Sequence, residues 1–201
     1  AKELSVDLVI TDHHKQSEEL PEAVAVVDPQ RTDCNIPFRD WAGVGVAFKT
    51  ICAVEGDGEE ELLDEFSDLV AIGTLADVVP LKKENRALVY EGLKRINSGS
   101  RQGIEALKNA AGVSGKKLGA GGISFTLAPR INAAGRMGSA MTAFRLLLSD
   151  DENDAAELDK NIDTYNKERH SVRKRDNKAG DSGNREPYPN EKYASVIVVS
   201  G

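Results

Sequence analysis

The sequence predicts an α/β fold, in which a parallel sheet is flanked by helices and followed by a long helix. Residues 5–11, "SVDLVIT", and residues 23–28, "AVAVVD", are short, mostly apolar runs rich in β-branched residues. This composition is typical of strands that are buried on both faces of a parallel sheet. From residue 44 onward the apolar residues follow helical spacing instead, so many helices are expected to cover the two strands.

The helical pattern is interrupted by Gly-containing segments such as "NSGSRQG" and "KKLGAGG". It predicts helices at about 43–54, 58–77, 84–97, 101–111, 120–129 and 139–148. We expect the second of these helices to be broken near Ser67.

A long helix is predicted after residue 149. The segment "SDDE" at 149–152 matches a capping box in which Ser149 is the cap. One apolar stripe follows on the same helix, formed by Ala155, Leu158, Ile162, Tyr165 and Val172. Residues 179–193 are rich in Gly, Pro and Asn, which predicts a linker, and "ASVIVVSG" at 194–201 predicts one more strand.

Composition excludes several classes of protein. No apolar run approaches the roughly 20 residues that span a bilayer, so we expect no membrane role. The start "AKELSVDLVI" lacks the features of a signal peptide and resembles the interior of a longer chain. Cys34 and Cys52 have no paired spacing, which favours reduced thiols in a cytoplasmic protein. The net charge is −7, so any binding of nucleic acid must depend on local basic clusters.

The first candidate site is Asp12, His13 and His14, at the end of the first strand. Open α/β sheets bind ligands at the carboxyl ends of their strands. Imidazole and carboxylate are ligands for Mn²⁺, Fe²⁺ or Zn²⁺, and Asp12 could instead orient a histidine. The alternative is a polar loop that contains histidines by chance.

Two further candidates lie downstream. Asp77 is surrounded by Ala, Leu and Val in "AIGTLADVVPL", where a divalent cation would offset the cost of a buried carboxylate; alternatively, Asp77 caps a helix end. In "LAPRINAAGRMG", Arg130, Asn132 and Arg136 alternate with small residues, and guanidinium groups suit phosphate oxygens. The alternative is that both arginines form surface salt bridges.

The segment "NKERHSVRKRDNK" at 166–178 carries six Lys or Arg residues against two acids. Such a helix could follow a nucleic-acid backbone, or it could simply be a solvated face.

Three of these segments, "VITDHH", "GTLADVVPL" followed by "ENRALVYEGL", and "APRINAAGRMG", resemble the RecJ single-strand-specific exonucleases of the DHH phosphoesterase superfamily, in the order of that family. "LDKNIDTYNKERHSVRKR" resembles the helix that connects the DHH domain to the DHHA1 domain in those enzymes. The resemblance implies a DHH domain at 1–148, a connecting helix at 149–178, a linker at 179–193 and the start of a DHHA1-like domain at 194–201.

The resemblance also implies roles for individual residues. His13 and Asp77 would be ligands of a two-metal site for Mn²⁺ or Mg²⁺, Asp12 would support the metals, and His14 would face the scissile phosphate. Arg130, Asn132 and Arg136 would hold the nucleic-acid backbone or a terminal phosphate. The family also uses aspartates upstream of the DHH motif, whereas only Asp7 precedes Asp12 here. We therefore expect an incomplete site and a chain that is inactive alone.

The function implied by the resemblance is metal-dependent 5′-to-3′ hydrolysis of single-stranded DNA in repair and recombination. Two alternatives stay open: a phosphodiesterase of short oligonucleotides or cyclic dinucleotides, and a non-catalytic nucleic-acid-binding relative. A single-strand-binding protein is the partner expected from the family, and the oligomeric state is left open.

Overall fold

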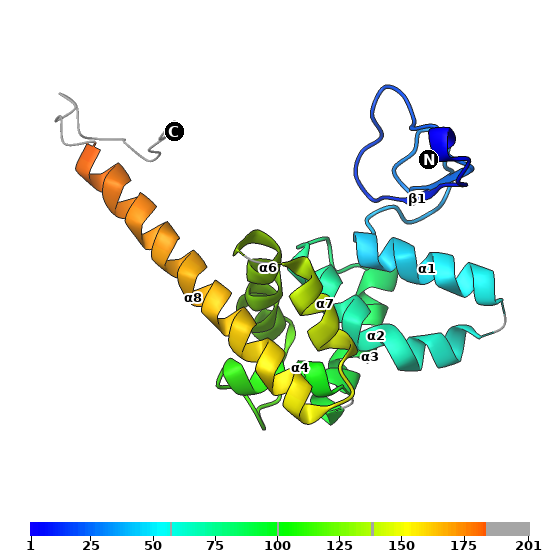
Figure 1. Cartoon of the computed structure of the whole chain (residues 1–201). Helices are drawn as coiled ribbons and strands as arrows, with labels where there is room; N and C mark the ends of the chain where they lie inside the picture. The colour runs from blue at the N-terminus through cyan, green and yellow to red at the C-terminus, as the bar shows by residue number, and fades with distance from the viewer. Residues whose placement is uncertain (57, 100, 138, 184–201) are drawn as a thin grey trace, which may run out of the picture.

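The computed structural model describes residues 1–201 except 57, 100, 138 and 184–201. It has two regions: a small N-terminal sheet with long loops, and a larger helical body below it (Figure 1). The α/β class predicted from the sequence is confirmed, although helices account for most of the described residues.

The N-terminal sheet consists of β1 (Val9–Thr11) and β2 (Ala25–Val27), preceded by a short 3-10 helix at Lys2–Leu4. The strands are parallel, with Val9 opposite Ala25 and Thr11 opposite Val27. Parallel pairing was predicted correctly, but burial on both faces was wrong: Val9 is 57% exposed and Val24, just before β2, is 69% exposed. The described part of the sheet has two strands, so both have a free edge, and α1 contacts β1.

The first half of the helical body contains α1 (Gly43–Glu55), α2 (Glu59–Ala76) and α3 (Lys83–Ser98). The break expected near Ser67 is absent, because α2 is continuous through that residue. Ser67 is buried, and a Cβ at Gly92 of α3 would lie 2.1 Å from the Ser67 carbonyl oxygen. The small residues at this crossing allow α2 and α3 to pack closely, which outweighs the modest helix propensity of serine.

The second half contains α4 (Gln102–Ala110), α5 (Ala120–Gly122), the π-helical turn η2 (Ile123–Leu127), α6 (Ala128–Met137) and α7 (Ala140–Leu148). We expected a helix to end near residue 129, but the helical path continues to Met137. Pro129 has no amide hydrogen to donate, and the Ala128 amide donates five residues back to the Ile123 carbonyl. The π turn thus accommodates a proline that would otherwise disrupt an α-helix.

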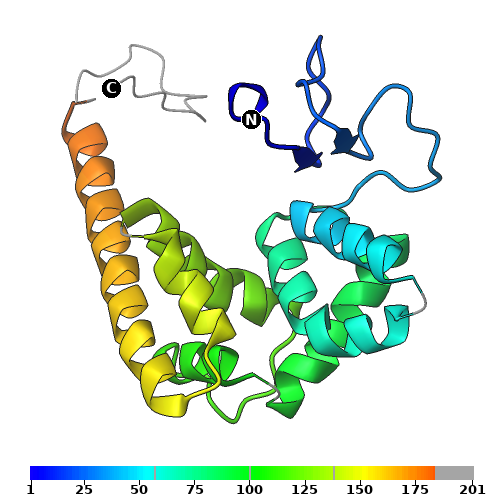
Figure 2. The same ribbon diagram turned by 45° about the vertical axis from the view of Figure 1, so that its right-hand side comes forward.

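A long helix, α8 (Glu152–Gly183), packs against α4, α6 and α7 along its first half and then projects beyond them (Figure 2). Its cap is Asp151 rather than Ser149, because Asp151 Oδ1 accepts from the amides of Asn153 and Asp154. Ala155 and Ile162 are buried, as the apolar stripe predicted. The helix extends into the predicted linker, and the predicted strand at 194–201 lies outside the described residues.

The main core lies between α2, α3, α4, α6, α7 and α8, around fully buried side chains that include Ile104, Leu107, Ile123, Leu146 and Ile162. A smaller cluster around Phe38, Trp41 and Phe48 connects the loop after β2 to α1 and α2. Among the described residues, no helix is long and apolar enough to cross a membrane.

Candidate metal centre

The DHH segment begins where β1 ends, at the carboxyl edge of the parallel pair. The Asp12 amide donates to the Val27 carbonyl at 3.0 Å, which extends the pairing of the two strands by one residue. The side chains of Asp12, His13 and His14 therefore start from a backbone that is fixed by β2. This is the edge at which open α/β sheets place their ligands.

Asp12 organises the two histidines. Its Oδ1 atom accepts from the His13 amide at 2.7 Å and the His14 amide at 3.2 Å, and it lies 2.7 Å from His14 Nδ1. The His14 ring bond and these amide bonds lower the pKa of Asp12 to about 2. The same hydrogen bond between the His14 ring and Asp12 raises the pKa of His14, and the negative charge of Asp12 adds to this effect. Asp12 is thus an anion at neutral pH. Its second carboxylate oxygen, Oδ2, takes part in none of these three interactions.

His13 points into the helical body, unlike the exposed His14. Its Nε2 atom lies 3.0 Å from Asp77 Oδ2, and its Nδ1 atom lies 3.8 Å from Asp12 Oδ1. The imidazole therefore bridges a carboxylate of the sheet and a carboxylate of α2. A Cβ at Gly43 would lie 3.1 Å from His13 Nδ1, so the first residue of α1 leaves room for this ring.

Asp77 immediately follows α2 and is its C-terminal cap residue. A carboxylate at this end of a helix faces the negative pole of the helix dipole, so a cation beside it is favoured. Its carboxylate contacts His13. The loop after it is held by buried Asn85, whose side-chain amide donates to the Asp40 carbonyl at 2.6 Å and the Pro80 carbonyl at 3.1 Å. Val78, in this loop, has a φ of 60°, a strained conformation for a β-branched residue.

Of the three polar residues predicted on the "APRINAAGRMG" segment, two face this centre. His13 and Asp77 line a cavity of about 600 Å³ together with Asn132 and Arg136 of α6. The lining of this cavity thus includes an imidazole, a carboxylate, a guanidinium and an amide. A phosphate in the cavity could accept from one cationic donor, the Arg136 guanidinium, and from one neutral donor, the Asn132 amide.

Arg130 lies elsewhere, between α6 and α8. Its Nη1 donates to the Thr126 carbonyl at 2.8 Å, and its Nη2 lies 3.7 Å from Asp163 Oδ1. Asp159, also on α8, is buried nearby, and this burial and the Asp163 charge raise its pKa to about 6. In this structure Arg130 connects two helices through a partly buried contact, which differs from the surface salt bridge that the sequence left open as the alternative.

The residues fit a divalent cation by their donor chemistry. Ligand atoms of Asp12, His13 and His14 all lie within 4.8 Å of one another, and Asp77 adds a carboxylate next to His13. Oxygen and imidazole donors of this kind suit Mn²⁺. Gly43 and Asn85 were not singled out from the sequence; the small-residue run "AGVGVAF" at the start of a predicted helix was the available signal for Gly43.

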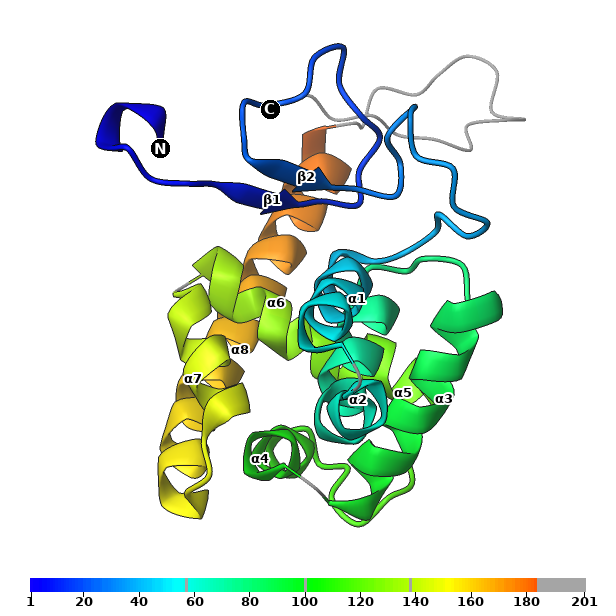
Figure 3. The ribbon, with the colours of Figure 1, turned by 90° about the vertical axis from the view of Figure 1, so that its right-hand side faces the viewer.

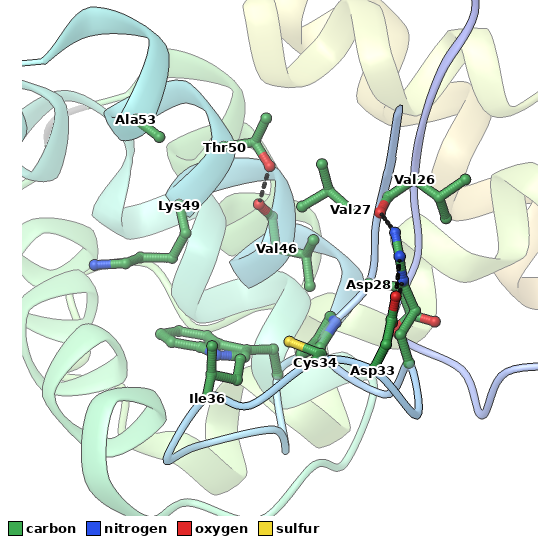
Figure 4. Close-up of a pocket in the computed structure, with 13 residues that line it drawn as sticks. Val26, Val27, Asp28, Asp33, Cys34, Ile36, Val46, Lys49, Thr50 and Ala53 are labelled. Carbon is green, nitrogen blue, oxygen red and sulfur yellow. Dashed lines mark hydrogen bonds and ion pairs between the residues drawn. The ribbon is translucent and has the colours of Figure 1, made fainter. Parts of the chain in front are cut away.

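A separate cavity of about 480 Å³ lies between β2 and α1 (Figure 4). Its walls are mainly apolar and include Val26, Ile36 and Val46, and at its edge Arg31 bonds the Val26 carbonyl and pairs with Asp33. Neither Asp12, His13 nor Asp77 lines it, so it is distinct from the metal centre.

Comparison with known proteins points to one family. The DHH family, N-terminal domain, matches residues 1–74. The single-stranded-DNA-specific exonuclease RecJ of Bacillus subtilis is 45% identical over 86% of this chain and 21% of that protein, and RecJ of Escherichia coli is 40% identical over 86% of this chain and 32% of that protein. The chain thus spans about a fifth to a third of these relatives.

Solved structures agree with the sequence comparison. An exonuclease RecJ bound to manganese superposes with a TM-score of 0.72 at 40% identity, over 85% of this chain and 43% of that one. RecJ of Thermus thermophilus in complex with Mn²⁺ gives a TM-score of 0.70 at 38% identity, over 85% of this chain and 25% of that one. Residues 1–74 therefore match the DHH family, N-terminal domain, and over most of its length the chain is similar in sequence and fold to one segment of the RecJ exonucleases.

Proposed function

We propose that the protein containing this chain is a metal-dependent exonuclease that hydrolyses single-stranded DNA from the 5′ end, in repair and recombination. The observation that carries this proposal is that the His13–Asp77 pair lines the same cavity as Asn132 and Arg136. His13 and Asp77 would hold Mn²⁺ or Mg²⁺, and a second ion would need further ligands. The metals would activate a water molecule and neutralise charge on the phosphate.

The residues of this chain have separate roles in the proposal. Asp12 accepts hydrogen bonds from the two histidine amides and contacts the His14 ring, and the His14 imidazole would face the scissile phosphate. Arg136 and Asn132, which line the same cavity, would bind phosphate oxygens. Arg130 would act through the placement of α6, because it contacts α8.

The proposed division of the chain is a DHH domain at 1–148, a connecting helix that follows it and continues to Gly183 as α8, a linker up to 193 and the start of a DHHA1-like domain at 194–201. The long α8, which leaves the helical body, supports the connecting helix (Figure 1). A cytoplasmic location and recruitment by a single-strand-binding protein belong to the same proposal, and the free Cys34 and Cys52 are consistent with the former.

The test is Mn²⁺-dependent digestion of a 5′-labelled single-stranded DNA, by this chain and by the full-length product of its gene. We expect the full-length protein to release nucleotides and His13→Ala or Asp77→Asn to lower the rate at least about 100-fold, since each removes a metal ligand. Asp64→Asn is the control, because Asp64 is an exposed carboxylate of α2, and this variant should keep the rate. Mn²⁺ affinity, followed by electron paramagnetic resonance, should fall in His13→Ala and Asp77→Asn only.

The alternatives give different results in this assay. Faster turnover of dinucleotides than of long strands would indicate a phosphodiesterase of short or cyclic substrates. Binding of DNA by a wild-type protein that neither binds Mn²⁺ nor releases nucleotides would contradict the exonuclease and favour a binding module.

A further inference from the structure

A further cavity, which has basic walls, lies at the end of α3 that is far from the candidate metal centre. Its volume is about 820 Å³, in the range of about 300 to 1,000 Å³ found for ligand sites. Four lysines are among its lining residues, and none of the described lining residues is acidic. Since the chain as a whole carries a net charge of −7, this is a local reversal of sign. Such a reversal favours an anionic ligand.

The lysines of this cavity fall into two pairs. Lys94 pairs with Glu91 at 2.9 Å, and buried Lys108 pairs with Glu105 at 2.6 Å, so both have a carboxylate nearby. Lys116 and Lys117 are exposed, and neither side chain forms an ion pair with a described residue. These two ammonium groups are therefore the ones available to an incoming anion.

The loop that carries Lys116 and Lys117 is anchored. The Asn97 side chain donates to the Leu118 carbonyl at 2.9 Å and accepts from the Leu118 amide at 2.7 Å. Leu118 itself is buried in the main core. The two lysines are thus held next to a fixed backbone, which lowers the entropy cost of binding through them. Gly115, with a φ of 69°, makes the turn that precedes them.

An aromatic ring stands beside these cations. Tyr90 is 60% exposed on α3, and Lys94 Nζ lies 4.3 Å from the centre of its ring. Cations interleaved with exposed aromatic rings are the composition of grooves that bind single-stranded nucleic acid without sequence preference. A small inorganic anion would not stack on the ring.

The cavity is remote from the metal centre. Asn85, near the start of α3, fixes the loop after Asp77, whereas Asn97 lies about 18 Å further along the helix at 1.5 Å per residue. Figure 3 shows the C-terminal end of α3 at the opposite end of the helical body from β1 and β2. A ligand in this cavity therefore does not occupy the catalytic site.

We propose that Lys116 and Lys117, with Tyr90 in the lining of the same cavity, form a second binding site for the phosphate backbone of a single-stranded nucleic acid. It would hold a part of a long strand that the metal centre does not contact. The identity of the ligand rests on the proposed function, whereas the basic cavity is a property of the structure.

The test compares three proteins: the wild type, the double variant Lys116→Gln/Lys117→Gln, and a control double variant, Lys2→Gln/Lys160→Gln. The control removes the same charge from exposed positions elsewhere. The measurement is the fluorescence anisotropy of an oligothymidylate of about 20 nucleotides, in EDTA, over a salt series. Each lost phosphate contact lowers the slope of log affinity against log salt by about 0.7, so the double variant should lose about 1.4. The control should keep the wild-type slope, and circular dichroism checks that all three proteins are folded.

Equal slopes for the two double variants would overturn the proposal. It would also be overturned if inorganic phosphate bound with the same lysine dependence while the oligonucleotide did not, because the cavity would then be a small-anion site. Digestion of a trinucleotide with Mn²⁺ separates this result from the proposed function, since that substrate is too short to reach the cavity. Lysine-dependent binding without any digestion would support the second site and contradict the exonuclease.

Discussion

The two regions of the molecule contribute to one site but are stabilised very differently. The helical body encloses a core whose largest side chains are fully buried, and it supplies Asp77, Asn132 and Arg136. The N-terminal sheet supplies Asp12, His13 and His14 from two short strands whose side chains are largely exposed. The His13–Asp77 contact joins the regions. The difference indicates that one half of the metal centre is rigid by packing, whereas the other depends on a few polar contacts.

The largest expected effect comes from the buried charge of the helical body. Asp68 is fully buried, and its Oδ2 lies 3.1 Å from Arg101 Nε and 3.5 Å from Arg95 Nε. Removing one partner of a buried ion pair leaves uncompensated charge, so Asp68→Ala should lower the free energy of unfolding by about 3 to 5 kcal/mol. Urea denaturation measures this change.

The matched control for Asp68 is in the N-terminal region. Glu22 pairs with Lys2 at 2.8 Å, but both side chains are at least 80% exposed. Glu22→Ala should therefore change the free energy of unfolding by less than about 1 kcal/mol. A similar loss of unfolding free energy in Asp68→Ala and Glu22→Ala would show that charges in the two regions are stabilised in the same way.

The contact between α6 and α8 should make stability depend on pH. The unfolded chain releases the Asp159 proton near pH 3.8, but the folded chain keeps it until about pH 6, because of burial and the nearby Asp163. Between these values the folded state binds more protons, so this group lowers stability as pH rises. Asp159→Asn should raise the free energy of unfolding at pH 8 by roughly 1 to 3 kcal/mol, at about 1.4 kcal/mol per pKa unit, and have little effect near pH 3.

The measurement is urea denaturation at pH 3, 5 and 8. Asp163→Asn is the control, since Asp163 has cationic partners in Arg130 and Lys167 and its removal should not stabilise the protein. An Asp159→Asn variant that is less stable than wild type at pH 8 would contradict the raised pKa.

The sequence predicted the helical body better than the sheet. Helical spacing reflects burial along a single segment, so α1, α3, α4 and α7 agree with the expected ranges within a few residues. The break at Ser67 was wrong because the close approach of Gly92 comes from another helix, which the local pattern does not contain. Strand burial depends on neighbouring strands and covering helices, and the described sheet has two strands.

The same reasoning separates the parts of the candidate site. Asp12, His13 and Asp77 were predicted as site residues because carboxylate and imidazole side chains follow apolar runs in the sequence. The structure brings these three side chains together. Asn132 and Arg136 line the cavity, but Arg130 does not. Asn132 and Arg136 are four positions apart and share one face of α6, whereas Arg130 is two positions before Asn132 and lies on another face. Which face meets α8 is set by tertiary packing. Gly43 acts by lacking a side chain, and its meaning appears only once the His13 ring is in place.

The smallest expected change in stability tests whether the two regions meet with a defined geometry. Gly43→Ala would place a Cβ 3.1 Å from His13 Nδ1 and 3.3 Å from its Cε1. The ring must then move by a few tenths of an ångström away from the position that sets its 3.0 Å distance to Asp77. Alanine is the better helix former, so the free energy of unfolding should change by less than about 1 kcal/mol.

Mn²⁺ affinity should fall several-fold in the same Gly43→Ala variant, because ligand atoms must be held close to their productive geometry. Gly121→Ala is the control: it is also a helical glycine, but no atom lies within 4 Å of its added Cβ, and it should bind Mn²⁺ like wild type. If Gly43→Ala keeps its Mn²⁺ affinity, His13 is free to move and the sheet half of the centre is not positioned by α1. If the variant instead loses several kcal/mol of stability, Gly43 belongs to the packing of the helical body rather than to the site.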